Sequence, residues 1–336
     1  MRPPFRSIPW RSLRSGIAAL WLLAFVAVPP PASSEALPSR TIALTTDGPA
    51  AASAWLIDQL RTECAALMGS EFDLRFPEQL QLSAGGTLEG ARGAHDRLLA
   101  DPGVDLIVAL GPLVSSEIVA RDDFPVPVIA PFVLDVLNPS IPRAPGGGSG
   151  VPNLSYVEPV FDFAHDVRRF RELVEFERIA VLGPAGLLER LAPDADTLGE
   201  LAALELQLQP VALTDDLDAV LAALAPGTDA AYLVAPPQTD DPGRTRLLDA
   251  LHARGIATFT VAGEIGVRAG ALAGLTPADW WPRLMRRTAL NARHVLTGDP
   301  AATLRTQLTR DEEFYLNMAT ARRLGISPTF ALMTDA

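Results

Sequence analysis

Short apolar runs alternate with longer amphipathic segments along most of this chain. Apolar residues recur at helical spacing in the longer segments, which predicts helices over 50–68, 87–99, 113–120, 161–175, 194–204, 217–224, 244–254 and 278–296. The short apolar runs predict strands over 41–44, 72–76, 104–110, 127–130, 178–182, 206–213, 230–234 and 256–261. Continuous apolar strands separated by amphipathic helices are typical of parallel sheets that helices cover on both faces.

The alternation breaks over 138–150, where proline, glycine and serine dominate. This segment indicates either a crossing between domains or a flexible surface loop. The tripeptides Leu110-Gly111-Pro112 and Leu182-Gly183-Pro184 each close an apolar run on either side of it. We therefore predict an α/β protein with two doubly wound, Rossmann-like lobes joined by crossover hinge segments. The first lobe is expected over 37–150, with the return of part of the C-terminal region, and the second over 151–336 with the hinge crossings and the tail.

The first 36 residues have the pattern of a secretory signal peptide. Four arginines precede an apolar run over 16–28, and prolines and small residues follow it. The run falls short of the ~20 apolar residues that a membrane-spanning helix needs, and an uncleaved anchor is the alternative. Cleavage after Ala36 removes four arginines and one glutamate, which lowers the formal net charge from -12 to -15. We expect a soluble periplasmic protein without a lipid anchor, because no cysteine lies near the cut.

The amino-acid composition excludes or disfavours several classes of site and partner. All 28 basic residues are arginine, so a lysine Schiff-base enzyme and a GxxxxGK phosphate loop are excluded. The net charge of -12 disfavours a polyanionic partner, and we expect no nucleic acid. The single cysteine, Cys64, and four scattered histidines give no spacing typical of a metal site. We therefore expect neither a metal nor a cofactor.

Candidate binding residues follow the predicted strands, because ligands of open α/β sheets bind beyond the carboxyl ends of the strands. Small residues there let a ligand approach the backbone, and amides at helix starts favour an anionic group. The candidates are Thr45, Thr46, Asp47, Tyr156 and Glu264 as polar contacts, Phe132 as a stacking surface, and the turn residues Gly111, Pro112, Gly183, Pro184 and Pro236, with amides near Gly111 and Gly183 holding an anionic group. A structural alternative exists for each: Gly-Pro forms turns, threonine caps helices, and phenylalanine belongs in cores.

Sequence patterns typical of catalytic sites are weaker than those that indicate a binding site. No Ser/His/Asp constellation is evident, and the glycine-rich run 146–150 lacks the register of a nucleophile elbow. The paired carboxylates at 122–123, 215–216, 240–241 and 312–313 are more typical of helix caps and solvated faces than of acid/base pairs. We expect a protein that is not an enzyme, with a periplasmic hydrolase as the alternative that turnover assays would reveal.

The C-terminal third resembles the periplasmic substrate-binding proteins of a bacterial ABC-transporter family that includes aromatic amino-acid binders. The similar stretches are 267–277, 296–300 and 316–326, and within the last of them Asn317, Ala321, Leu324 and Gly325 fit the family pattern. The runs VDLIVALG and RIAVLG also fit, as does 153–155, which corresponds to an Asn-containing crossing, so the resemblance covers about residues 40–336. Three family features are altered here, at 111–117, 135–139 and 154–155. The resemblance therefore does not establish the ligand's identity or that it is an amino acid.

The resemblance implies a type I periplasmic-binding-protein fold with three crossings between the lobes. It also implies a small ligand in the interlobe cleft, and an ABC permease and an ATPase as partners. We expect that ligand to be amino-acid-like or, from the amides at the helix starts, anionic. We expect an extracytoplasmic solute-binding protein of an ABC-type importer that captures its ligand by hinge closure. The alternative is a ligand-sensing periplasmic protein that signals to a membrane partner without transport.

Overall fold

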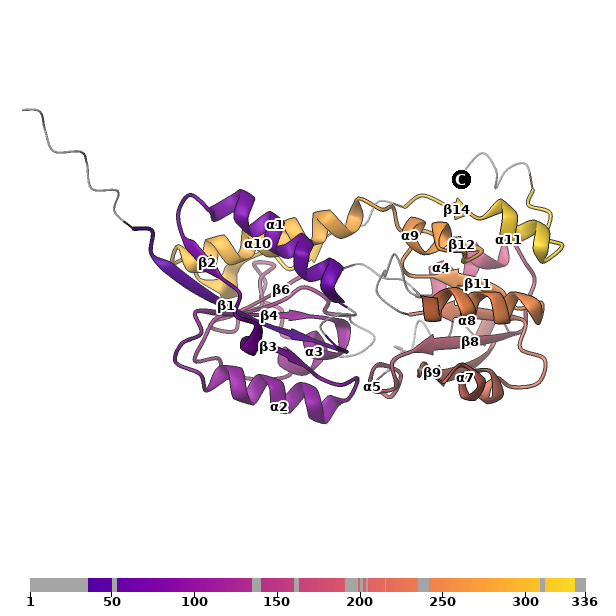
Figure 1. The fold of residues 1–336 in the computed structure, drawn as a ribbon, viewed down its shortest axis with the longest axis horizontal. Helices are drawn as coiled ribbons and strands as arrows, with labels where there is room; N and C mark the ends of the chain where they lie inside the picture. The colour runs from indigo at the N-terminus through magenta and orange to yellow at the C-terminus, as the bar shows by residue number, and fades with distance from the viewer. Residues whose placement is uncertain are drawn as a thin grey trace, which may run out of the picture. The chain divides into compact units, whose positions relative to one another are not determined.

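A computed structural model describes residues 36–49, 53–134, 140–159, 163–190, 199, 202–203, 205–214, 216–234, 242–308 and 312–329 (Figure 1). The chain divides into two units, Met1–Ala36 and Leu37–Ala336, and all elements below lie in the second. Almost all of the predicted signal peptide, and most of the predicted helix 194–204, lie outside the described residues. None of the helices in the described part of the chain combines the length and apolar character needed to cross a membrane.

The first lobe is built on a parallel sheet with strand order β2-β1-β4-β5-β6, and β3 pairs with the same edge of β1 as β2 does. The strands are β1 Ser39–Thr46, β2 Asp73–Arg75, β3 Gln81–Ser83, β4 Leu106–Leu110, β5 Val128–Ala130 and β6 Leu154–Tyr156. Alternate residues of the central strands enter opposite cores, as strand geometry requires: Ile42 and Leu44 face one side and Ala43 the other. Burial on both faces explains why these strands are continuous apolar runs.

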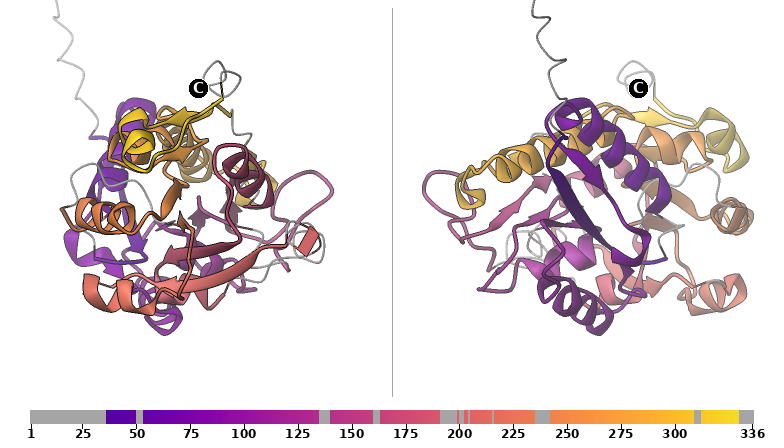
Figure 2. Two further views of the ribbon diagram at one scale, coloured as in Figure 1. Left: turned by 90° about the vertical axis from the view of Figure 1, so that its right-hand side faces the viewer. Right: turned by 60° about the vertical axis from the view of Figure 1, so that its left-hand side comes forward.

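Helices cover both faces of this sheet. On one face lie α1 Ala54–Met68 and α10 Trp280–Leu296, which pack side by side although they are far apart in the sequence (Figures 1 and 2). On the other face lie α2 Leu88–Leu99 and α3 Pro112–Ile118, and a short 3-10 turn, η2 Glu78–Leu80, precedes β3. Helix α10 thus places a segment from the C-terminal part of the chain on the sheet of the first lobe.

The second lobe repeats the arrangement, with strand order β14-β12-β11-β10-β8-β9. Its strands are β8 Arg178–Gly183, β9 Gln207–Ala212, β10 Ala230–Leu233, β11 Ala257–Thr260, β12 Ala273–Gly274 and β14 Tyr315–Leu316. Only β14, among these described strands, runs antiparallel to its neighbour. Its helices are α4 Phe163–Arg171, α5 Ala185–Leu188, α7 Leu217–Ala223, α8 Pro242–Ala253, α9 Glu264–Arg268 and α11 Met318–Arg323. Two separate apolar cores line the two faces of the sheet.

The chain passes between the sheets after β6, again before α10, and a third time after β13 Gln307–Leu308. The first passage contains β7 Glu158–Pro159, which pairs in parallel with β13, and η4 Ala301–Thr303 lies shortly before β13. The predicted fold class, with two doubly wound lobes and crossover segments, is therefore confirmed.

Three sequence interpretations need correction. Neither 138–150 nor 153–155 is a crossing, because residues 154–156 form β6 of the first sheet, beyond the boundary placed at 150. Strands β3 and β6 were not predicted, because polar residues at 81, 83 and 155 replace a continuous apolar run in them. The two Leu-Gly-Pro tripeptides are not equivalent: Gly111 follows β4, which pairs with the first strand of its lobe, whereas Gly183 ends β8, which is itself the first strand of the second lobe. Their likeness reflects local turn chemistry.

Candidate functional site

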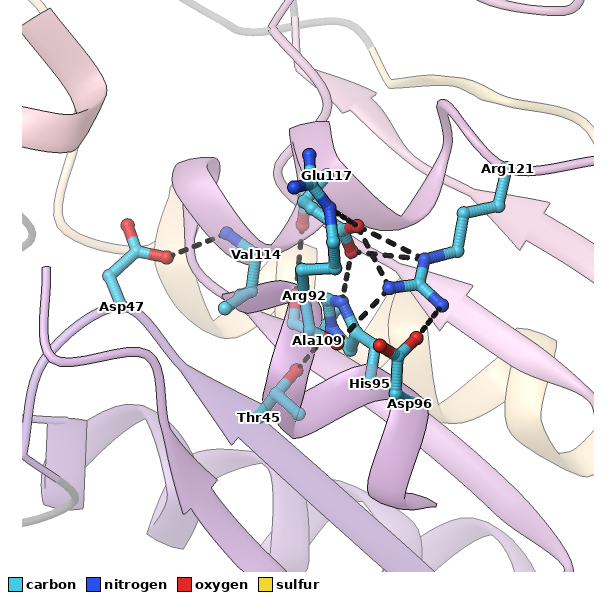
Figure 3. A network of polar contacts seen from close by, with 10 residues as sticks. Thr45, Asp47, Arg92, His95, Asp96, Ala109, Val114, Glu117 and Arg121 are labelled. Carbon is cyan, nitrogen blue, oxygen red and sulfur yellow. Dashed lines mark hydrogen bonds and ion pairs between the residues drawn. The ribbon is translucent and has the colours of Figure 1, made fainter. Parts of the chain in front are cut away.

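The Asp47 carboxylate occupies the point where β1 ends and α3 begins. Its Oδ2 accepts the backbone N–H of Leu113 at 3.1 Å, and its Oδ1 accepts that of Val114 at 2.9 Å (Figure 3). Pro112 is the first residue of α3, where its missing N–H costs no hydrogen bond. The parallel pairing of β1 with β4 places Asp47 beside the start of this helix. Asp47 therefore directly follows a strand, as predicted, and its orientation is fixed by two amides.

Gly111 makes room for this carboxylate. A Cβ atom at position 111 would lie 2.2 Å from Oδ1 of Asp47, well inside van der Waals contact. The absence of a side chain at Gly111 is therefore a requirement of the Asp47 geometry, and not only of the turn.

We expect Gly111→Ala to displace the Asp47 carboxylate and lower the free energy of unfolding by about 1–2 kcal/mol, the value of its charge-assisted hydrogen bonds. Chemical denaturation measures this loss. Gly48→Ala is the matched control, because a Cβ there would meet nothing within 4 Å. In an Asp47→Ala background the cost of Gly111→Ala should disappear. A full cost in that background would show that Asp47 is not the group in conflict.

Burial raises the pKa of Asp47 to about 6, although the amides of Val114 and Leu113 act in the opposite direction. No charged side chain contributes to this shift. A carboxylate with a raised pKa is one whose negative charge is poorly compensated by its surroundings.

A buried polar network lies next to this point in the first lobe (Figure 3). Thr45 bonds through Oγ1 to Nε2 of His95 at 3.0 Å, and Nδ1 of His95 lies 2.5 Å from Oε2 of Glu117. Arg121 donates to Glu117 at 2.9 Å and to Asp96 at 2.7 Å. Burial alone would raise the pKa of Glu117, but the hydrogen bonds and charges of His95 and Arg121 outweigh it and lower the pKa. This network joins α2, α3 and β1.

Several predicted polar contacts have partners inside the protein. The hydroxyl of Thr46 donates to the carbonyl of Gly48 at 2.7 Å, and that of Tyr156 donates to the carbonyl of Pro142 at 2.8 Å. Thr45, Thr46 and Tyr156 are all buried. Phe132 is buried as well, with its ring centroid 6.3 Å from that of Trp281. These placements give the four residues a structural role, whereas ligand contact by them stays a prediction.

Turn amides expected to bind an anionic group are already used. Leu113 and Val114, which follow Gly111, donate to Asp47, and Gly186, close to Gly183, donates to the carbonyl of Gly86 at 3.1 Å. These three amides therefore have acceptors within the protein, and anion binding near Gly183 stays a prediction. Pro184 precedes α5, and Pro236 lies outside the described residues.

Two contacts connect the lobes near α5. Besides the hydrogen bond between Gly186 and Gly86, Nε of Arg190 donates to Oγ of Ser116 at 3.1 Å. These residues follow β8 in the second lobe and β3 and β4 in the first, so both contacts join carboxyl ends of strands.

Glu264 stabilises the second crossing. Its Oε2 accepts the amide of Ala278 at 3.0 Å, its own amide donates to the carbonyl of Thr276 at 2.8 Å, and its other carboxylate oxygen pairs with Arg268. The candidate of the second lobe is therefore neutralised by a neighbouring cation, unlike Asp47.

The proline- and glycine-rich segment, where it is described, is bound to the crossing segments. The amide of Gly150 donates to the carbonyl of Ala302 at 3.0 Å, and the amide of Thr306 donates to the carbonyl of Gly147 at 2.9 Å. Arg143 pairs with Glu158 of β7 at 2.5 Å. The described part of this segment is therefore bonded to β7 and to the residues that lead to β13, unlike a flexible surface loop.

The described residues contain no group of three or more His, Cys, Asp or Glu side chains arranged to hold a metal ion. Cys64 is buried in the α1–α10 core, and burial raises the pKa of its thiol to about 12.

Comparisons with known proteins give a consistent architecture. A conserved domain protein from Vibrio cholerae matches with a TM-score of 0.68 at 15% identity, covering 89% of this chain and 98% of that chain. An ABC domain from Streptococcus pneumoniae in complex with L-Trp matches with a TM-score of 0.67 at 15% identity and the same coverage, 89% and 98%. This chain has the type I periplasmic-binding-protein fold.

A third structure with this fold is a substrate-binding protein with adhesive properties from Clostridium difficile, in its ligand-free, open form. It matches with a TM-score of 0.50 at 16% identity, covering 87% of this chain and 96% of that chain. No protein-family model and no curated protein matches the chain. At these identities, the type I periplasmic-binding-protein fold is the property that the proteins share.

Proposed function

We propose that this protein is an extracytoplasmic solute-binding protein that holds a small molecule between the carboxyl ends of its two parallel sheets. The observation that carries the proposal is that two doubly wound sheets are connected by crossing segments, two of which form the paired strands β7 and β13. Ligands of such sheets bind beyond the carboxyl ends of the strands, and paired crossing strands can act as a hinge.

Asp47 is the main polar contact in this proposal. It directly follows β1, its carboxylate is held in one orientation, and no cation in the described part of the chain neutralises it. Thr45 and Tyr156 are left out of the proposed site, because their hydroxyls are satisfied inside the first lobe.

Delivery of the solute to an ABC permease and its ATPase is the transport role that we favour. The family resemblance of the sequence supports it, as does a fold shared with an ABC domain in complex with L-Trp. The signal-peptide pattern of the first 36 residues supports a periplasmic location. A ligand sensor is the second candidate, and genes for a permease or for a sensor kinase beside this one would distinguish the two.

Ligand binding and closure can be measured on protein recovered from cells that express the full chain. Native mass spectrometry of the purified protein should reveal a co-purified small molecule. After removal and re-addition of that molecule, the melting temperature should rise by several degrees and the radius of gyration from small-angle X-ray scattering should fall. A protein that binds no small molecule, or one that converts it to product, would contradict the proposal.

A further inference from the structure

Several buried or half-buried carboxylates of the described residues have a cationic partner, and the buried Asp166 accepts a hydrogen bond from the hydroxyl of Tyr232. Glu117 has Arg121 and His95, Glu158 has Arg143, and Glu264 has Arg268. Asp47 makes no ion pair with any described residue, and its only described carboxylate partners are two backbone amides. The first lobe therefore presents an oriented negative charge at the carboxyl end of β1 that has no counterion among the described residues.

Four segments outside the described residues add no positive charge near the carboxyl ends of the strands, whereas Arg310 of the segment 309–311 follows β13 and the other undescribed arginines belong to the first 35 residues. Segments 50–52, 135–139, 191–198 and 235–241, which follow β1, β5, α5 and β10 in the sequence, contain no arginine, lysine or histidine. They contain five aspartates instead: Asp135, Asp194, Asp196, Asp240 and Asp241. No cation from these segments can neutralise Asp47.

The hydrogen bonds of Asp47 leave capacity for a ligand. An ionised carboxylate offers about four lone-pair positions, and the amides of Leu113 and Val114 use one on each oxygen. Each oxygen therefore keeps one acceptor position, and the two amides fix the direction in which it points. Charge-assisted hydrogen bonds from a cation would fill these positions.

We propose that Asp47 binds the positively charged group of the solute, an ammonium or guanidinium with N–H donors, so that the ligand is an organic cation or zwitterion. This assignment rests on the proposed solute-binding function and gives its ligand a chemical class. It replaces the expectation of an anionic group at the turn amides, since Asp47 itself occupies the amides of α3. It differs from that expectation in the sign of the charge that the first lobe recognises.

The test compares ligands that differ in charge and little else. The probes are L-arginine with L-citrulline, putrescine with 1,4-butanediol, and L-tryptophan with indole-3-propionate, together with sodium and magnesium chloride as inorganic cations. Any co-purified molecule is added to this set. Thermal shift ranks the binding of each probe, and titration calorimetry gives the affinity of those that bind.

We expect bound compounds to carry an N–H cation, and Asp47→Asn to weaken their affinity at least tenfold, because an amide cannot supply the charge. Asp105→Asn is the matched control. Asp105 also accepts a backbone amide, that of Thr41 at 2.8 Å, but it lies at the amino end of β4, so its replacement should leave affinity unchanged. Circular dichroism confirms that both variants are folded.

The pH dependence gives a second readout. A cation binds the ionised form of Asp47, and burial raises the pKa of this group to about 6. Affinity for an amine probe should therefore fall as the pH is lowered through about 6 in the wild type, and change little in Asp47→Asn.

The outcomes distinguish a failure of the cation assignment of Asp47 from a failure of the solute-binding function. If the protein binds neutral or anionic compounds, or if Asp47→Asn binds amines as tightly as the wild type, the cation assignment is wrong and the solute-binding function stands. Stabilisation by magnesium or sodium alone that disappears in Asp47→Asn would make the site one for inorganic cations. Binding of no compound at all would overturn the solute-binding function.

Discussion

Replacement of Glu117 by alanine should lower the free energy of unfolding by about 3 kcal/mol, measured by urea denaturation at pH 7. Glu117 is buried and accepts hydrogen bonds from both His95 and Arg121. Its removal leaves His95, which has no exposed surface, without its Nδ1 partner, and leaves Arg121 without its main counterion. Breaking one side of a buried charged network is costly, since the remaining groups stay desolvated.

Asp96→Ala is the control for this prediction, because Asp96 pairs with the same arginine at 2.7 Å but is exposed. Exposed ion pairs contribute about 0–1 kcal/mol, so the loss should be at most about 1 kcal/mol. Equal losses for the two variants would show that Glu117 is no more important than a surface partner of Arg121.

The pH dependence of Glu117 has a definite sign. Its pKa is lowered from the ordinary value of 4.5, because His95 and Arg121 outweigh the effect of burial. The native state therefore binds fewer protons at this site than the unfolded state, and the stabilisation is present above pH 4.5 and is lost as the pH falls through the lowered pKa. Glu117→Gln cannot titrate, so its stability deficit relative to the wild type should shrink below pH 4.5. A deficit that stays constant down to pH 3 would contradict this assignment.

The fold was largely predictable because its central strands are buried on both faces. Ile42 and Leu44 pack against α1 and α10, while Ala43 between them faces the opposite core, so every residue of this run is apolar. Strands at the edge of the sheet, such as β6, lack this continuous apolar pattern. Strand β6 contains Ser155, which accepts a hydrogen bond from Asn291 of the returning helix α10, and nothing local in the sequence indicates that pairing.

The candidate site was predictable only where it follows a strand. Asp47 was identified because it ends an apolar run, and the structure places it next to the Gly111 turn. The His95–Glu117 pair could not be identified, since its members lie on two different helices and 22 positions apart. A histidine on the apolar face of α2 was the available signal, but its partner depends on how α2 packs against α3.

Replacement of Gly263 by alanine should lower the free energy of unfolding by about 3 kcal/mol or more. Gly263 precedes α9 with a φ of +58°, and a Cβ there would lie 1.9 Å from the carbonyl oxygen of Thr276. Thr276 belongs to the crossing that leads to α10, and its carbonyl accepts the amide of Glu264 at 2.8 Å. The added methyl group must push two backbone segments apart and break this bond, since no flexible side chain can yield.

Gly255→Ala separates the two causes of that loss. Gly255 also has a positive φ, +76°, but a Cβ there would meet nothing within 4 Å, so only the backbone conformation is strained. Its loss should be about 1 kcal/mol, and the excess loss of Gly263→Ala measures the close approach to Thr276. Equal losses would mean that the crossing relaxes freely around a methyl group. Because this crossing connects the second sheet to α10 of the first lobe, a rigid crossing confines lobe movement to the remaining passages, which include the β7–β13 pair.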